Sequence, residues 1–134
     1  MTIPSEHQEQ TELFHALAVW ATENPLAGLA YAVPNGGHRA QKVANMLRDE
    51  GVKPGVPDVF WPVPRGRYHG MYLELKRRAH RNEAGRLVKP QPSAKQRQWM
   101  DALRAQSYFV VVAWGCDQAL EWMRHYWALG GFHA

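Results

Sequence analysis

The sequence of 134 residues contains a single cysteine, Cys116, and no apolar run long enough to cross a bilayer. One cysteine excludes an internal disulfide and a zinc site built from several cysteines. A membrane-spanning helix needs roughly 18 apolar residues, and the first residues of the chain have neither a basic nor an apolar signal segment. We therefore expect a protein of a reducing, cytoplasmic compartment with no membrane partner.

The composition is that of an ordinary globular domain. Hydrophobic residues make up 46% of the chain and charged residues 21%. The length is too short for two domains of usual size, and no internal repeat or low-complexity tract is present. We predict one domain over residues 1–134.

Basic residues are unevenly distributed along the chain. Positions 65–97 contain ten Lys or Arg residues and two acidic residues, a local charge of +8, which leaves −4 for the rest of the chain. Such separation of sign within a small domain is typical of a polyanion binder, although a basic loop can also be a merely solvated surface. Nucleic acid is therefore the leading partner on charge alone.

Hydrophobic periodicity predicts alternating helices and strands. Helices are expected over residues 5–23 and 39–50, from Ser93 onward, and over 117–129 with Asp117 as the cap. Strands are expected at 29–33, 58–61, 70–76 and 108–114, the last at the sheet centre because it is continuously apolar. Residues 77–92 should form an exposed basic loop. This order predicts an α/β fold with a mixed central sheet flanked by helices.

The strand at 70–76 carries two charged side chains on one face. Side chains alternate along a strand, so Glu74 and Lys76 point to the same side. For this pair alone, a half-exposed strand with a polar face is an adequate interpretation. Asp58 stands at the start of the preceding strand, directly after a turn rich in Pro and Gly. If the two strands are neighbours, Asp58 and Glu74 meet at one end of the sheet beside Lys76.

Carboxylates and a lysine in this arrangement suit phosphodiester hydrolysis. Two adjacent carboxylates repel unless a cation lies between them, and hard oxygen ligands select Mg²⁺ or Mn²⁺. A neighbouring lysine can orient or help to deprotonate an attacking water, and it can stabilise the charge that develops on a phosphate.

Five segments in order resemble a known nuclease family. They are Glu6 with Gln10, residues 34–39 (Pro-Asn-Gly-Gly-His-Arg), residues 51–58 (Gly-Val-Lys-Pro-Gly-Val-Pro-Asp), residues 74–76 (Glu-Leu-Lys) and residues 93–96 (Ser-Ala-Lys-Gln). Together they resemble the VRR-NUC branch of the PD-(D/E)xK nucleases, over a stretch from Glu6 to beyond Trp114. The resemblance implies a restriction-endonuclease-like core of helix, three strands, helix and strand, to which residues 39–50 and the terminal segment add helices.

The resemblance also implies roles for individual residues. It implies that Asp58, Glu74 and the backbone carbonyl of Leu75 bind Mg²⁺ or Mn²⁺, and that Lys76 is the catalytic lysine. Glu6 matches the glutamate of the opening helix, which joins the site directly or through water; Glu9, nearly on the same helix face, is the alternative. Gln96 matches a glutamine that orients the lysine, a water or the phosphate, with helix capping as the other interpretation.

Contacts to DNA are expected from the loop of the resembled family and from the basic segment. The residues expected to make them are Asn35, Arg39, Arg77, Arg78, Arg81 and Lys95. Asn35 with Gly36 can equally be a simple turn. The function expected is that of a Mg²⁺- or Mn²⁺-dependent DNA endonuclease. The alternative is a non-catalytic or weakly catalytic nucleic-acid-binding module that uses the basic surface of residues 65–97.

The expected substrate is branched DNA. The sequence has no zinc finger and no recognisable helix-turn-helix that would read a base sequence. Some stand-alone members of the resembled family act on branched DNA, and symmetric cleavage of a four-way junction is most simply done by a two-fold dimer. We therefore expect a homodimer joined through the apolar segment 122–132, for which ordinary packing against the sheet is the alternative.

Overall fold

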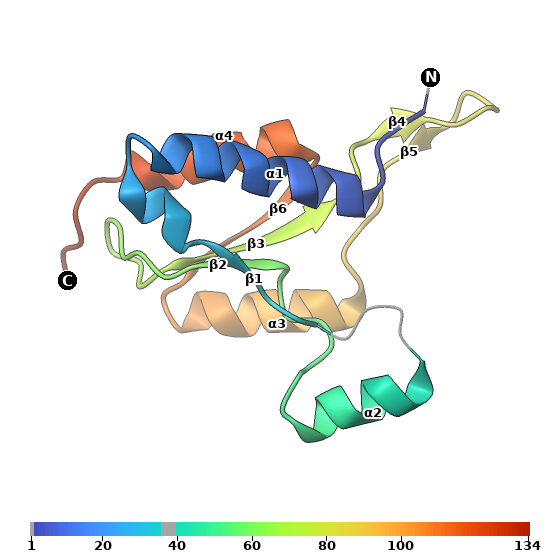
Figure 1. Cartoon of the computed structure of the whole chain (residues 1–134), viewed down its shortest axis with the longest axis horizontal. Coiled ribbons are helices and arrows are strands. Elements are labelled where there is room, and N and C mark those ends of the chain that lie inside the picture. Colours follow the sequence, from blue (N-terminus) through green and yellow to red (C-terminus); the bar gives the residue numbers. More distant parts are fainter. Residues whose placement is uncertain (1, 36–39) are drawn as a thin grey trace.

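The computed structural model describes residues 2–35 and 40–134 (Figure 1). Its helices and strands are α1 (Glu6–Ala21), the 3-10 helix η1 (Pro25–Leu29), β1 (Tyr31–Ala32), α2 (Gln41–Asp49), β2 (Val59–Trp61), β3 (Met71–Lys76), β4 (His80–Arg81), β5 (Leu87–Val88), α3 (Ala94–Ala105), β6 (Phe109–Trp114) and α4 (Cys116–Trp127). Among the described residues, no helix is both long enough and apolar enough to span a bilayer.

The central sheet of the described residues has the strand order β1-β2-β3-β6. The β1–β2 and β2–β3 pairs are antiparallel, whereas β3 and β6 run parallel. The prediction of a mixed sheet flanked by helices is thus confirmed. The prediction that residues 108–114 form the sheet centre is wrong, because β2 and β3 are the inner strands and β6 lies at the edge of the described sheet. Both α3 and α4 pack against β6, which explains why an edge strand is apolar on both faces.

Helices cover the two faces of the sheet unequally. In Figure 1, α1 and α4 lie together on one side of the sheet and α3 lies on the other. The main core forms beneath α1 and α4. It includes the buried side chains of Leu13, Leu17, Leu73, Leu75 and Met123. Trp61 is fully buried there and lies against Trp20 and Trp127. The other face of β3 therefore remains available for polar side chains at its carboxyl end.

Three local predictions differ from the structure. The expected basic loop contains an antiparallel hairpin in which His80 pairs with Val88 and Arg81 with Leu87. The terminal helix begins at Cys116 with Gly115 as its N-cap, so Asp117 lies in the first turn and does not cap it. The predicted strand at 29–33 is reduced to two residues, because Pro25 opens a 3-10 helix that continues to Leu29.

The predicted second helix is present as α2, but its apolar face is not buried. Val43 and Met46 are 42% and 54% exposed, and no residue of α2 is buried. The helix ends before Gly51, which has a φ of 98°. Figure 1 shows α2 standing apart from the sheet.

The C-terminal segment packs against its own domain. Trp127 stacks on Trp61 at a ring-centroid distance of 6.0 Å, and the guanidinium of Arg65 lies 3.8 Å from the Trp127 ring centroid. The N–H of Gly66 donates to the carbonyl of Gly130 at 3.0 Å. Leu129 and Phe132 remain 38% and 48% exposed. Trp127 therefore packs within its own domain, whereas Leu129 and Phe132 leave two apolar side chains at the surface.

Candidate active site

Strand pairing places Asp58 beside Glu74. Val59 of β2 pairs with Leu73 of β3, so the residue before Val59 lies level with the residue after Leu73. The Asp58 carboxylate accepts a hydrogen bond from the N–H of Leu75 at 2.8 Å through Oδ2. The side-chain amide of Asn35 donates to Oδ1 at 3.0 Å. Because both oxygens are engaged, the orientation of the Asp58 carboxylate is fixed.

The turn before Asp58 depends on Gly55. Its φ of 91° is in the left-handed region, and a β-carbon built there would lie 2.7 Å from Cγ of Lys95 and 3.1 Å from the Trp99 ring. Glycine thus allows the chain to pass close to the start of α3. This close approach places Asp58 and the first turn of α3 on the same side of the sheet.

Glu74 is buried without a hydrogen-bonding partner. Its residue exposure is 1%, and neither carboxylate oxygen has a donor within the described part of the chain. Burial, and then the negative charge of Asp58, raises the pKa of Glu74 to about 9. A buried carboxylate with two unsatisfied oxygens is unfavourable in a protein interior. This arrangement points to a positively charged group that the carboxylate binds.

Lys76 is held by Gln96. The lysine Nζ donates to Oε1 of Gln96 at 3.0 Å, and the same oxygen accepts the backbone N–H of Ser93 at 2.8 Å. Ser93 and Gln96 also form the capping box expected at the start of this helix. Both interpretations of Gln96 therefore apply together, because one side-chain oxygen caps α3 and accepts from the lysine.

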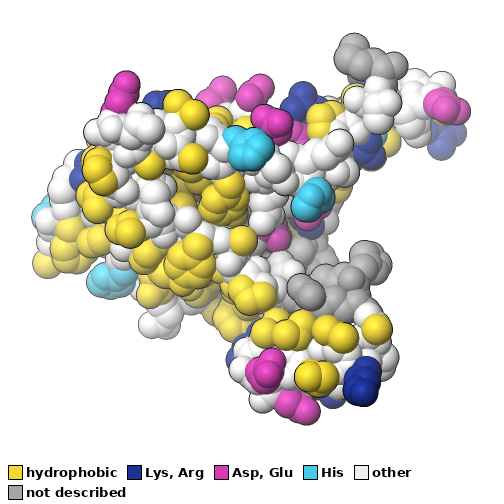
Figure 2. Space-filling view, in the orientation of Figure 1, with side chains coloured by type: hydrophobic (Ala, Val, Ile, Leu, Met, Phe, Trp, Pro, Cys, Tyr) yellow, Lys and Arg dark blue, Asp and Glu magenta, His cyan; other side chains and the backbone are white. Residues whose placement is uncertain are grey.

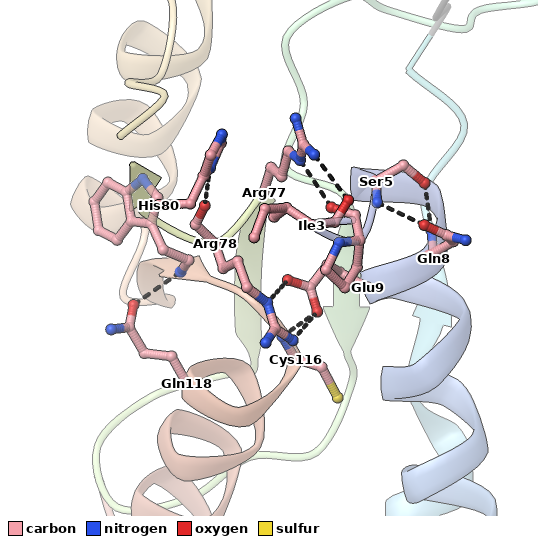
Figure 3. Close-up of polar contacts among 11 residues, drawn as sticks. Ile3, Ser5, Gln8, Glu9, Arg77, Arg78, His80, Cys116 and Gln118 are labelled. Atoms are coloured by element: carbon pink, nitrogen blue, oxygen red, sulfur yellow. Dashed lines mark hydrogen bonds and ion pairs between the residues drawn. The ribbon is translucent and has the colours of Figure 1, made fainter. Parts of the chain in front are cut away.

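The two glutamates of α1 have different surroundings. Burial raises the pKa of Glu6, the negative charge of Asp58 raises it further, and the positive charge of Lys76 opposes this. Glu9 is 1% exposed and accepts two hydrogen bonds from Arg78, at 2.7 and 2.8 Å (Figure 3). These bonds hold the pKa of Glu9 below its usual value. The structure thus brings Glu6 within electrostatic reach of the site and engages Glu9 elsewhere.

A solved structure with the same fold identifies the domain. The structure of a "VRR_NUC domain protein" matches this chain with a TM-score of 0.71 and 25% sequence identity, over 99% of this chain and 96% of that chain. The chain is a VRR-NUC domain. No family model matches the sequence, and no curated protein matches it.

A VRR-NUC domain is a nuclease-family domain, and its partner is nucleic acid. The residues expected to contact DNA in this VRR-NUC domain occupy different environments. Arg77 donates to the backbone carbonyls of Ile3 and Pro4, each at 2.8 Å, and Arg78 is bound to Glu9. Arg81 and Lys95 are exposed. Asn35 contacts Asp58 as described, and Arg39 lies outside the described residues. Arg77, Arg78 and Asn35 are thus engaged by partners 73 and 74, 69 and 23 positions away in the sequence, and the residues around them give no sign of these contacts.

The donor set of the VRR-NUC domain fits a hard divalent cation. No three His, Cys, Asp or Glu side chains in residues 2–35 and 40–134 form a metal site by themselves. Asp58 and the unpaired Glu74 nevertheless supply two neighbouring carboxylates, which suit Mg²⁺ or Mn²⁺. Any further ligands would have to come from the backbone, from water or from the substrate, as is usual for Mg²⁺.

Proposed function

We propose that this VRR-NUC domain is a Mg²⁺- or Mn²⁺-dependent DNA endonuclease that hydrolyses phosphodiester bonds. The observation that carries the proposal is the buried Glu74 carboxylate, which has no donor among the described residues and lies beside the fixed Asp58 carboxylate. A domain that only bound nucleic acid would gain nothing from this unfavourable burial, whereas a bound divalent cation would supply the partner that the carboxylate lacks.

Asp58, Glu74 and the backbone carbonyl of Leu75 would hold the metal, with Glu6 joining through a water. A bound Mg²⁺ or Mn²⁺ supplies Lewis-acid polarisation of the scissile phosphate and lowers the pKa of a water. Asp58 keeps one orientation because Leu75 and Asn35 donate to its two oxygens. A carboxylate fixed before the substrate arrives needs little reorganisation during the reaction.

Lys76 and Gln96 act on the substrate side of the site. The hydrogen bond to Gln96 restricts the long lysine side chain to the face of the sheet that carries Glu74. From there the ammonium stabilises negative charge that develops on the phosphate, and it orients the attacking water. Gln96 is a positioning residue, since it reaches the chemistry through Lys76.

For the substrate, we propose branched DNA cleaved by a homodimer. The described residues contain no separate module for reading a base sequence, so selectivity would depend on the shape of the nucleic acid. The exposed Leu129 and Phe132 provide apolar surface for a second copy of the chain.

Cleavage of defined DNA structures tests the function. The purified chain is incubated with linear, nicked, flapped and four-way DNA, with Mn²⁺ or with EDTA, beside the Lys76→Met variant. We expect cleavage with Mn²⁺ only, and loss of cleavage with retained DNA binding in the variant, because binding depends mainly on phosphate contacts. Binding without cleavage of any substrate by the unaltered chain would favour the alternative of a non-catalytic binding module.

A further inference from the structure

The hairpin of β4 and β5 is an arm that extends from the domain (Figure 1). We call residues 80–88 the β4–β5 arm; every residue from 81 to 87 is exposed. Figure 2 shows the arm standing out from the body, with Lys or Arg side chains and an acidic side chain near its tip. A short two-stranded ribbon with this exposure has no core of its own, which suggests that it contacts another molecule.

The two faces of the arm differ in chemistry. Cross-strand partners share a face, so His80 lies with Val88 and Arg81 lies with Leu87. The first pair is half-buried, whereas the second is exposed. Leu87 is 60% exposed, next to Arg81 across the ribbon and Arg86 along it. One face therefore presents the apolar side chain of Leu87 beside the guanidinium group of Arg81, and the side chain of Arg86 extends from the opposite face of the ribbon.

The base of the arm is fixed to the domain. The ion pair of Arg78 with the buried Glu9 anchors the first strand, as Figure 3 shows. The Trp114 indole N–H donates to the carbonyl of Pro90 at 2.6 Å, and Nζ of Lys89 lies 4.2 Å from the Trp114 ring centroid. Contacts before β4 and after β5 thus fix the direction of the arm relative to β3.

The arm begins close to the proposed catalytic lysine. Arg81 follows Lys76 by five positions along the chain, so their Cα atoms are at most about 18 Å apart. This distance corresponds to about five base pairs of duplex. A nucleic acid bound at Lys76 thus passes within reach of the exposed face.

We propose that the β4–β5 arm enters a groove of the nucleic acid, where Leu87 wedges between unstacked bases while Arg81 and Arg86 contact the flanking phosphates. The inference rests on the proposed function for the position of the substrate. Apolar wedges on a basic arm are a known way to open a base step, and two-stranded ribbons fit into grooves of DNA. Opening a step costs least where the bases are already poorly stacked, as at a branch point. Leu87 would therefore favour branched over intact duplex DNA.

Fluorescence of 2-aminopurine, which rises when the base unstacks, tests the wedge. The probe is placed at successive positions within six base pairs of the mapped cut, in a four-way junction and in linear duplex. All proteins carry Lys76→Met so that the DNA stays intact. We expect a severalfold increase at one junction position, and Leu87→Ala should remove more than half of it. The matched control is Leu29→Ala, which truncates another exposed leucine and should retain the full increase.

Cleavage rates provide the second measurement. With Lys76 intact, Leu87→Ala should lower the ratio of junction to linear cleavage at least fivefold while the linear rate stays within about twofold. Arg81→Gln combined with Arg86→Gln should lower the slope of log affinity against log salt by about 0.9 for each phosphate that the arginines no longer neutralise.

The possible outcomes distinguish failure of the proposal for Leu87 from failure of the proposed nuclease function. A 2-aminopurine signal and a cleavage ratio that do not depend on Leu87 overturn the wedge while cleavage itself stands. Conversion of a dimer into a monomer by Leu87→Ala, without a change in the signal, also overturns it and assigns the residue to contact between copies. A signal that depends on Leu87 without any cleavage in Mn²⁺ supports the wedge and refutes the nuclease. Absence of nucleic-acid binding refutes both.

Discussion

Replacing Glu74 with glutamine should stabilise the metal-free protein at neutral and alkaline pH while it removes activity. The wild-type carboxyl group is buried, and its pKa is raised from 4.5 to about 9. The native state therefore keeps a proton that the unfolded chain loses above pH 4.5. Because the native state binds more protons in this window, the free energy of unfolding falls as pH rises from about 4.5 towards 9.

The size of the effect follows from the width of that window. Between pH 4.5 and pH 7 the free energy of unfolding falls by about 3 kcal/mol, or about 10 °C in Tm for a domain of this size. Glutamine has nearly the same shape and does not ionise. Glu74→Gln should therefore match the wild type at pH 5 in EDTA and melt about 10 °C higher at pH 7. Adding Mn²⁺ should stabilise the wild type and leave the variant unchanged.

Glu9 provides the control, because it is equally buried but paired. Hydrogen bonds from Arg78 lower the pKa of Glu9. The stability that this ion pair contributes is therefore present above the ordinary pKa of a glutamate and is lost as pH falls. Glu9→Gln should destabilise the protein at pH 7 by about 2 kcal/mol. Thermal melts from pH 5 to pH 8 in EDTA measure both variants. A Glu74→Gln variant that melts at or below the wild-type temperature at pH 8 would refute the reasoning.

Three further predictions concern catalysis and assembly. Gln96→Ala should reduce cleavage by about tenfold, because Lys76 loses its positioning partner. Gln8→Ala, which removes the matching capping box of α1, should leave the rate unchanged although both variants lose about 1 kcal/mol of helix stability. Mg²⁺ or Mn²⁺ should support cleavage, whereas Ca²⁺ should permit binding with little cleavage; robust cleavage in excess EDTA would exclude the mechanism. Sedimentation at micromolar concentration should show a dimer that Leu129→Glu with Phe132→Glu dissociates; a monomer with equal rates on junction and linear DNA would contradict both proposals about the substrate.

Local chemistry in the sequence predicts much of the fold and places the two strands of the site. The capping boxes at Ser5 and Ser93 are spaced so that each helix start can be found from the residues alone. Alternation along residues 70–76 and the turn before Asp58 predict that Asp58 lies beside Glu74 if the two strands are neighbours, and the pairing of β2 with β3 meets this condition. These features depend on contacts between residues close in sequence or on the two-residue alternation of side chains along a strand.

Features that depend on distant partners could not be predicted in this way. Strand β6 is apolar on both faces because helices cover it, and a strand in the sheet centre has the same pattern. The strands β4 and β5 have two residues each, too few for any period to appear. The partner of Arg78 is 69 positions away in the sequence, so the residues around this arginine indicate a DNA contact and give no sign of the ion pair.

The ion pair of Glu9 with Arg78 links the stability of the domain to the geometry of the proposed site. Arg78 follows Lys76 by two residues, and Glu9 follows Glu6 by three residues on nearly the same face of α1. The pair thus ties the start of α1 to the end of β3, and Arg77 adds two bonds to the chain before α1. Gly115 allows this close approach, since a β-carbon there would lie 3.1 Å from the Glu9 carboxylate. Glu6 is thereby held where burial raises its pKa, the negative charge of Asp58 raises it further and the positive charge of Lys76 opposes this. We therefore propose that Arg77 and Arg78, the first two arginines after β3, align the proposed site, and that exposed residues beyond them, such as Arg81 and Arg86, bind the nucleic acid.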